Sequence, residues 1–311
     1  MSAPPALDAA SARAEHRTGL THGLMAYGLW GMLPLYFKLF PNVSPVEVVS
    51  HRVIWSVGFL AVLLAGMRLY SPLRAALRSP RILGALTLSA LLIGINWLVF
   101  IWAVDAGHVL AASLGYFLNP LVNILIGTLF LSERLRRGQM VAVLIAAIGV
   151  AILAAGEWQT LWVSLSLAIS FAFYALVRKF TPVPSGVGLA VETLVLAPPA
   201  LAALAWFAHQ GTLAFGRDTV QTILMVGLGA ITSVPLLLFA SAARRLSMTT
   251  LGLLQYVAPS LQFLTGVFLL AEPLSLPRLL CFGYIWAALG LFVWDNLRAR
   301  RQPERTDTQQ A

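Results

Sequence analysis

The sequence predicts an all-α integral membrane protein whose ten transmembrane helices form a five-plus-five inverted repeat. Three observations lead to this prediction. First, the 311 residues are 59% hydrophobic and 11% charged, whereas a soluble domain carries about 25% charged residues. Second, one apolar segment returns in the second half of the chain at a constant spacing. Third, Lys and Arg gather in alternate loops, as they do on the cytoplasmic side of membrane proteins.

The first five predicted helices cover residues 18–40, 45–66, 81–104, 108–131 and 138–156. Residues 1–17 are rich in Ala and Pro, and we expect them to stay as a cytoplasmic tail because the first apolar run is too long for a signal peptide. Pro-containing pairs separate the first three helices: Pro41-Asn42, Ser71-Pro72 and Ser79-Pro80. We expect residues 18–156 to form the first repeat.

The second five predicted helices cover residues 158–179, 185–208, 219–243, 247–270 and 276–297. A loop with Pro and Gly, residues 182–186, separates the sixth helix from the seventh. The last helix is followed by a polar segment, residues 298–311, which we expect to be a disordered cytoplasmic tail. Residues 157–297 are therefore predicted to form the second repeat. The sequence does not fix the oligomeric state.

The repeated segment reads LGYFLNPLVNILIGTLFLSERL at residues 114–135 and LLQYVAPSLQFLTGVFLLAEPL at residues 253–274. Three residue pairs keep a constant spacing of 139: Pro120 with Pro259, Gly127 with Gly266, and Glu133 with Glu272. We expect the Pro and Gly residues to act as hinges, because Pro removes a helix hydrogen bond and Gly bends readily. The two Glu residues stand at helix ends, where a structural role is favoured over ligand binding.

Polar side chains form a stripe along each copy, at the helical spacing i, i+4, i+7 and i+11. The stripes are Tyr116, Pro120, Asn123 and Gly127 in the first copy, and Gln255, Pro259, Gln262 and Gly266 in the second, with Asn119 and Tyr256 beside them. A proline and amides on an apolar helix are expected where that face lines a cavity, because the freed carbonyl and the amides then find water, neighbours or a ligand. We therefore predict that both stripes line a central cavity; contacts between helices are the alternative.

The positions of Lys and Arg predict the orientation in the membrane. With the N-terminus in the cytoplasm, only Lys38, Arg217 and Arg278 fall in external loops, and Arg52 lies within a helix. The cytoplasmic set is Arg13, Arg17, Arg68, Arg74, Arg78, Arg81, Arg134, Arg136, Arg137, Arg178, Lys179, Arg244, Arg245, Arg298, Arg300, Arg301 and Arg305. Both termini are thus expected inside. The copies, in the fourth and ninth helices, then cross in opposite directions, and such inverted repeats supply the two conformations that alternating access requires.

At this level the chain resembles the EamA-like branch of the drug/metabolite transporter superfamily. The resemblance spans nearly the whole chain and is carried by HRVIWS (51–56), NWLVFIWAV (96–104), ASLGYFLNPLVNI (112–124), SFAFYALVRK (170–179), ETL (192–194), VPLLLF (234–239), TLGLLQY (250–256) and FGYIWAALGLFVWD (282–295). It implies a drug/metabolite transporter basket of ten helices around a central cavity, in the inner membrane of a bacterium, that exports or exchanges small molecules. It implies no particular substrate.

Arg52 is the sharpest single feature, because a charge inside a membrane costs several kcal/mol unless it is paired or faces water. Glu192 lies equally deep in the seventh predicted helix, at nearly the equivalent place of the second repeat. We expect Arg52 and Glu192 to face each other or to share a substrate such as a zwitterion, and Glu192 is a candidate carrier of a coupling proton. The alternatives are a strut between helices, or an ion pair of Arg52 with Glu47. His51 could relay a proton.

Asn96 lies in the middle of the third predicted helix, where an amide needs a hydrogen-bond partner. It therefore either lines the cavity or joins two helices. We include Asn96 among the residues expected to bind substrate.

Absent motifs argue against several classes of function. The sequence has no HExxH, no G-x-S-x-G and no metal-ligand cluster, so we expect no enzyme, no metal site and no cofactor. It has no Walker A motif, so a gradient and not ATP would drive it. The net charge of +9 lies mostly in loops and does not indicate nucleic acid. We predict a secondary transporter or exporter of metabolites, amino acids or amphipathic drugs, with the lipid bilayer, a small-molecule substrate and a coupling proton as partners. A passive facilitator without ion coupling is the alternative.

Overall fold

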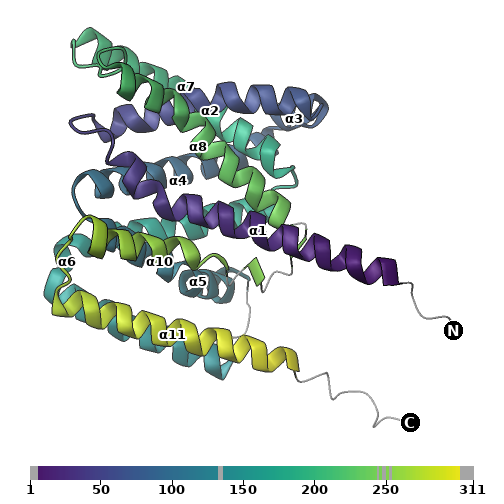
Figure 1. The fold of residues 1–311 in the computed structure, drawn as a ribbon, viewed down its shortest axis with the longest axis vertical. Coiled ribbons are helices and arrows are strands. Elements are labelled where there is room, and N and C mark those ends of the chain that lie inside the picture. The colour runs from purple at the N-terminus through teal and green to yellow at the C-terminus, as the bar shows by residue number, and fades with distance from the viewer. Residues whose placement is uncertain (1–5, 132–135, 244, 247–249, 252–253, 302–311) are drawn as a thin grey trace.

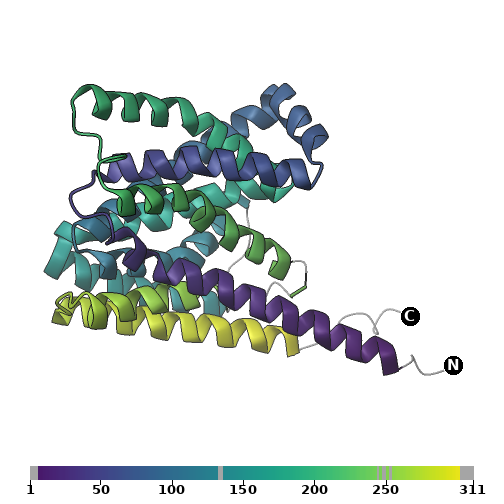
Figure 2. The same ribbon diagram turned by 45° about the horizontal axis from the view of Figure 1, so that its top comes forward.

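The structure is a computed structural model that describes residues 6–131, 136–243, 245–246, 250–251 and 254–301. In these ranges all regular secondary structure is helical, as predicted. The start of α1 and the end of α11 lie at the same end of the molecule (Figure 1). We call the opposite end, where α1 (Ala6–Phe37) finishes and α11 (Leu276–Arg301) begins, the distal end. The turned view shows the same arrangement of the long helices (Figure 2).

Three helices of the first half agree closely with the predicted ranges: α2 (Pro45–Gly66), α4 (Pro80–Asp105) and α5 (Val109–Leu131). The first helix differs, because α1 begins at Ala6, well before the predicted start at residue 18, and so includes most of the predicted tail. The prediction missed one element, because α3 (Tyr70–Arg78) occupies the expected loop around Ser71-Pro72. Pro72 stands in the first turn of α3, where a missing N–H costs nothing. Ala76 is buried while Arg74 is exposed, so α3 lies with one face against the rest of the protein.

The second half begins within a single long helix, α6 (Arg137–Phe180), which has 44 residues. Glu157 interrupts it with φ −146° and ψ 51°, at the predicted boundary between the fifth and sixth helices. The chain continues through α7 (Ser185–His209), α8 (Thr219–Ala243), α10 (Val257–Leu264) and the π-helical turn η1 (Thr265–Leu269). This turn contains Gly266, one of the predicted hinge residues, and π-helical turns often occur at functional positions.

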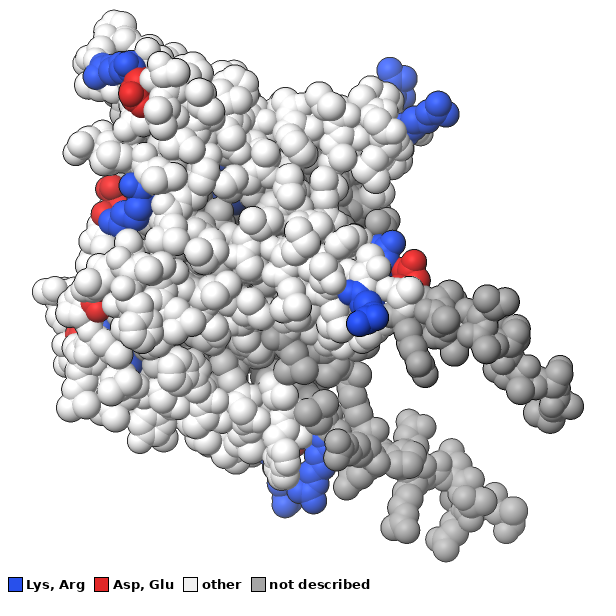
Figure 3. All heavy atoms as spheres, viewed as in Figure 1, with Lys and Arg blue, Asp and Glu red and all other residues white. Residues whose placement is uncertain are grey.

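The described residues contain six helices that are long and apolar enough to cross a membrane: α2, α4, α6, α7, α8 and α11. At 1.5 Å per residue, the 44 residues of α6 are long enough for about two crossings. Figure 3 shows charged side chains at the two ends of the molecule and a broad uncharged surface between them. Large apolar side chains such as Leu91, Ile95 and Leu144 are exposed, as expected for a lipid-facing surface. The ten-helix inverted repeat itself stays a prediction.

Two glycines allow the close helix contacts that position the functional residues. A Cβ atom at Gly229 of α8 would lie 2.5 Å from the carbonyl oxygen of Trp55 on α2. A Cβ atom at Gly115 of α5 would lie 2.8 Å from the carbonyl oxygen of Ser164 on α6. Only glycine fits at these distances without a backbone shift, so α8 can pack on α2, and α5 on α6, with their backbones in contact.

Candidate functional site

A buried guanidinium lies where α2, α4 and α8 meet. Arg52 is only 5% exposed, and its Nε donates a hydrogen bond to Thr232 Oγ1 at 3.0 Å. Thr232 in turn donates to the carbonyl oxygen of Leu228 at 2.8 Å, which orients its oxygen to accept from Arg52. The Arg52 Cζ lies 4.1 Å from the ring centre of Trp97 and 6.0 Å from that of Phe37.

Within the described residues, Arg52 has no carboxylate at ion-pair distance. Both expected partners are engaged elsewhere. Glu47 accepts hydrogen bonds from the backbone amides of residues 214–215, and Glu192 pairs with Arg178, whose Nε lies 3.6 Å from Glu192 Oε1. The expected direct contact of Arg52 with Glu192, and the alternative with Glu47, are therefore both wrong. The position of a residue along its helix predicts its depth in the membrane. It does not predict the side of the helix on which the side chain lies.

The contacts of Arg52 compensate its charge only in part. Removing a guanidinium from water costs several kcal/mol. A desolvated cation–π contact returns up to about 2 kcal/mol, and a hydrogen bond to a neutral hydroxyl about 1 kcal/mol. The balance is unfavourable for Arg52 alone, so this position resembles the functional charges found inside other membrane proteins.

A separate group of hydrogen bonds joins α5, α4 and α6 beside the Arg52 and Trp97 pair. The Tyr116 hydroxyl donates to Asn96 Oδ1 at 3.1 Å. Asn96 Nδ2 donates to Ser170 Oγ and to the carbonyl oxygen of Leu167, both at 3.0 Å. Asn96 therefore joins three helices. We call the following six residues the central cluster: Arg52, Asn96, Trp97, Tyr116, Ser170 and Thr232.

Glu192 forms a second buried polar group on the inner face of α7. It is 0% exposed and accepts hydrogen bonds from Ser89 Oγ at 2.6 Å and from the Tyr174 hydroxyl at 3.5 Å. Its ion-pair partner Arg178 reaches it across Gly188, where an added Cβ atom would collide with Arg178 Nη1. Glycine at position 188 therefore makes room for the guanidinium.

Aromatic rings connect the surroundings of Arg52 with those of Glu192. Ring centres are 6.0 Å apart between Phe37 and Phe100, 5.6 Å between Phe100 and Tyr116, 6.3 Å between Tyr116 and Phe171, and 5.9 Å between Phe171 and Tyr174. The two buried polar groups are thus linked by a continuous aromatic series.

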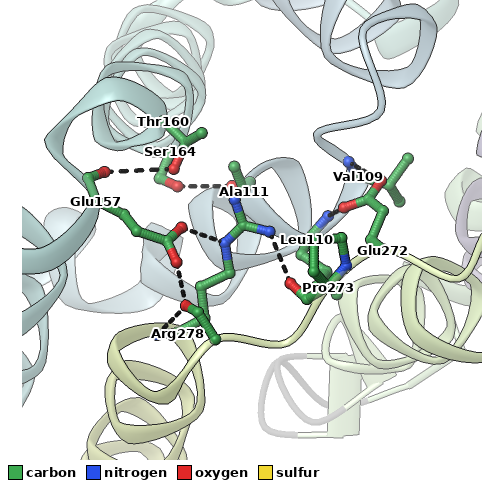
Figure 4. Close-up of polar contacts among 10 residues, drawn as sticks. Val109, Leu110, Ala111, Glu157, Thr160, Ser164, Glu272, Pro273 and Arg278 are labelled. Carbon is green, nitrogen blue, oxygen red and sulfur yellow. Dashed lines mark hydrogen bonds and ion pairs between the residues drawn. The ribbon is translucent and has the colours of Figure 1, made fainter.

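At the distal end, Glu272 ties the second half of the chain to the first (Figure 4). Its Oε1 accepts from the Val109 amide at 2.6 Å, and its Oε2 from the Leu110 amide at 2.9 Å. These amides begin α5, where a helix has unpaired N–H groups and a partial positive charge. The predicted structural role of Glu272 is consistent with this position. Its counterpart Glu133 lies outside the described residues.

Two further carboxylates make contacts at the same end, and those of Glu47 also join the two halves of the chain. Glu157, at the bend of α6, pairs with Arg278 Nε at 2.5 Å and accepts a hydrogen bond from Ser275 Oγ (Figure 4). Glu47, at the start of α2, accepts from the amides of residues 214–215 at 2.8 and 3.2 Å. His51 lies 3.8 Å from Glu47, so the structure places it with this distal carboxylate and not in the central cluster.

The residues of the two polar stripes have different surroundings. In the first copy, Tyr116 belongs to the central cluster, Asn119 is buried with no hydrogen-bond partner on its Oδ1 among the described residues, and Asn123 is exposed. In the second copy, Gln262 is 3% exposed and donates to the carbonyl oxygen of Trp30 at 3.3 Å.

The remaining stripe residues make contacts between helices or are only half-buried. Tyr256 stacks on Phe117, with ring centres 6.4 Å apart, and Gln255 is half-buried. The carbonyl oxygen of Pro259 accepts from Ser113 Oγ at 2.8 Å, which links α10 to α5 at a predicted hinge.

Sequence reasoning missed three partners: Thr232, Ser170 and Arg178. Thr232 and Ser170 are polar positions inside apolar helices, and that signal could have identified them. Arg178 was counted with the cytoplasmic loops, although its side chain is only 16% exposed. Its long aliphatic part allows the charge to reach inward from the helix end.

Comparisons with known proteins identify the group to which this arrangement belongs. The profile of the EamA-like transporter family matches residues 17–155. Protein RarD of Streptomyces exfoliatus is 44% identical over 289 residues, which cover 93% of this chain and 92% of that protein. The chain belongs to the EamA-like transporter family.

Two further comparisons agree with this result. Protein RarD of Escherichia coli (strain K12) is 42% identical over 292 residues, which cover 94% of this chain and 99% of that protein. A solved crystal structure covers 92% of this chain and 100% of its own, with a TM-score of 0.62 at 19% identity, and so has the same fold. The predicted resemblance to the EamA-like family is confirmed, and the chain is similar to the RarD proteins within it.

Proposed function

We propose that this EamA-like transporter is a secondary transporter that moves a small molecule through the bilayer by alternating access. In this proposal ten spans form two inverted repeats, and the central cluster contacts the substrate. The cluster combines side chains from both halves of the chain, with Arg52, Asn96 and Tyr116 from the first half and Ser170 and Thr232 from the second. A site shared by two halves is what their relative motion could expose to either side in turn.

The observation that carries this proposal is the unequal environment of two equivalent residues. Asn123 and Gln262 hold the same position in the two copies, yet Asn123 is exposed and Gln262 is 3% exposed. In an inverted repeat, Gln262 belongs toward the distal end and Asn123 toward the end with the termini. The unequal exposure supports the proposal that the structure represents one of two alternating states, the one in which the distal end is closed.

The distal end corresponds to the outside of the cell in this proposal. The basic loops and both termini would lie in the cytoplasm, following the positive-inside rule, and the protein would lie in the inner membrane of a bacterium. The substrate would reach the central cluster from the cytoplasm, and the direction would be efflux. Pro120 and Gly127 in α5, with Pro259 and Gly266 in the α10–η1 segment, would allow these helices to bend between the states.

Counterflow tests the proposal with a mixture of compounds, so the substrate can be identified in the same experiment. Proteoliposomes are loaded with a concentrated unlabelled extract of bacterial metabolites and diluted into a ¹³C-labelled extract, and mass spectrometry follows the labelled compounds inside. A carrier exchanges labelled for unlabelled substrate, so a labelled compound transiently exceeds its outside concentration. A passive pore gives equilibration without this overshoot, and absence of any protein-dependent uptake would refute transport.

Glu192 is the residue that we propose as the carrier of a coupling proton, because it is a buried carboxylate in the half of the chain opposite Arg52. Replacing Glu192 and Arg178 together by Gln removes both charges of the pair and leaves none uncompensated. The double variant is expected to keep counterflow but to lose accumulation driven by a pH gradient. If both activities persist, Glu192 and Arg178 are only a strut between α7 and α6.

A further inference from the structure

The central cluster holds one positive charge without a negative partner among the described residues, and this imbalance identifies a class of substrate. Arg52 is only 5% exposed, yet it has one hydrogen bond, to the hydroxyl of Thr232, and two aromatic neighbours. Guanidinium groups have five donors in a planar fork that matches a carboxylate. The N–H groups of Arg52 other than Nε have no acceptor among the described side chains and carbonyls.

We propose that Arg52 binds the anionic group of an organic monoanion, and that this anion is the transported substrate. The inference rests on the function proposed above and specifies the charge of its substrate. The group that would recognise the substrate is already held in place: Thr232 accepts from Nε, and Cζ lies over the Trp97 ring at 4.1 Å from its centre. Arg52 therefore presents its remaining donors without losing freedom when the anion binds.

The carboxylates near the cluster argue against a cation or a zwitterion. A substrate ammonium group in this cluster would lie near the positive charge of Arg52, so it would require a free negative charge nearby. Glu192 is held by Arg178, Ser89 and Tyr174, and Glu47 is held by two backbone amides. Asn119, one turn along α5 from Tyr116, has a buried Oδ1 that receives no hydrogen bond from the described part of the chain. An amide oxygen can accept from a hydroxyl of the substrate, but it does not neutralise an ammonium.

The surroundings of Arg52 also indicate the body of the anion. The aromatic series from Phe37 through Phe100, Tyr116 and Phe171 to Tyr174 begins beside the guanidinium. Aromatic rings stack on flat, apolar groups. The proposed substrate therefore joins one carboxylate, or another group with a single negative charge, to a flat apolar or aromatic body.

The counterflow experiment distinguishes this inference from the proposed function, because each labelled compound that overshoots has a known charge. The expected result is that overshooting compounds carry one anionic group and no ammonium. Overshoot confined to amines, neutral compounds or amino acids would overturn the inference about the anion. It would still support the proposed transport function. Absence of overshoot for all compounds would instead refute the proposed function.

Variants of Arg52 then test whether this residue binds the transported anion. Arg52→Gln is expected to lower the overshoot of the identified anion at least tenfold, while Arg52→Lys, which keeps the charge but not the fork, retains part of it. The control Arg81→Gln removes an exposed cation at the start of α4 and is expected to leave the overshoot unchanged. If Arg52→Gln protein fails to fold, the Lys variant carries the test through a raised KM. Unchanged transport in a folded Gln variant would overturn the proposal.

Discussion

Replacing Glu272 by Gln should open the distal end of the molecule. The carboxylate accepts two backbone amides, from Val109 at 2.6 Å and Leu110 at 2.9 Å, and it is 8% exposed. A Gln side chain keeps one acceptor, loses the charge and turns an NH₂ group toward the other amide. Hydrogen bonds to a charged group contribute about 1.5–3 kcal/mol each, against about 1 kcal/mol for neutral ones, and an unsatisfied buried amide costs about 1–3 kcal/mol.

The net effect is smaller than the sum of these terms, because removing the charge also removes the cost of burying it. We therefore expect the closed distal end to lose roughly 2 kcal/mol relative to the open state, which is about a 30-fold change in the equilibrium. A change of this size in the equilibrium between the closed and open states can be measured without any ligand. The two states of such proteins commonly differ by only a few kcal/mol in free energy.

The assay uses a thiol placed on the inner side of the contact between Glu272 and the start of α5. Ser113 is 0% exposed and lies one turn along α5 from Val109, and the native Cys281 is also 0% exposed. In a Cys281→Ala background, Ser113→Cys places a near-isosteric thiol where reagent arrives only if the distal end opens. Glu272→Gln is expected to raise the labelling rate by a membrane-impermeant methanethiosulfonate about 10–30-fold, following the equilibrium estimated above.

The control is Asp105→Asn, which removes an exposed carboxylate at the same end and should not change the rate. An equal rate in the Glu272→Gln variant and its parent, with both proteins folded by size-exclusion chromatography, would refute the assignment of Glu272 to the closed state. Labelling that rises equally at buried positions of the opposite end would indicate general unfolding instead of opening.

Three further outcomes can be measured by thermal unfolding and by transport. Gly229→Ala should lower the free energy of unfolding by about 1–3 kcal/mol, because its Cβ would meet the Trp55 carbonyl at 2.5 Å. The control Gly58→Ala has open space around it and should be neutral or stabilise by up to about 1 kcal/mol. Equal melting temperatures for the two variants would contradict the close contact. Glu192→Gln alone should destabilise by about 3–5 kcal/mol, since it removes the negative charge that pairs with Arg178. The double replacement by Gln should recover most of that loss. Thr232→Val removes the acceptor of the Arg52 Nε, so KM for the anion should rise several-fold while stability falls by only about 1 kcal/mol; an unchanged KM would mean that Thr232 does not position the guanidinium.

Hydrophobic patterning predicted the helices well because each apolar run had to be long enough for a bilayer and ended at Pro or Gly. The boundary at Glu157 was recovered in this way, although the chain continues there as one bent helix. One exception was α3, whose nine residues are too few for a span and look like a polar loop in a pattern dominated by long apolar segments. Another was the start of α1 at Ala6, because residues 6–17 are not apolar enough to be recognised as part of a span.

The candidate site was predicted only in part, for a physical reason. Arg52 and Asn96 could be recognised because a charge or an amide in an apolar helix requires a partner, and Tyr116 because it belongs to the repeated polar stripe. Which partner it finds depends on the rotation of each helix and on close contacts at residues such as Gly229 and Gly188. The pairing of Glu192 with Arg178 could not be read from the sequence, since it depends on a guanidinium that reaches inward from a helix end.

Because α6 bends only at Glu157, its second part is one continuous helical segment that can rotate about its distal end. From Glu157 to Phe180 the helix runs without another break, a length of about 35 Å at 1.5 Å per residue. Rotation about one end of an arm of that length by roughly 10° displaces the other end by about 6 Å, close to one helical turn. Arg278 and Ser275 bind the side chain of Glu157. The start of this helical segment is therefore held in place at the distal end. In the proposed alternating-access motion, the largest displacements would fall on Arg178 and its neighbours, at the end of the molecule opposite Glu157.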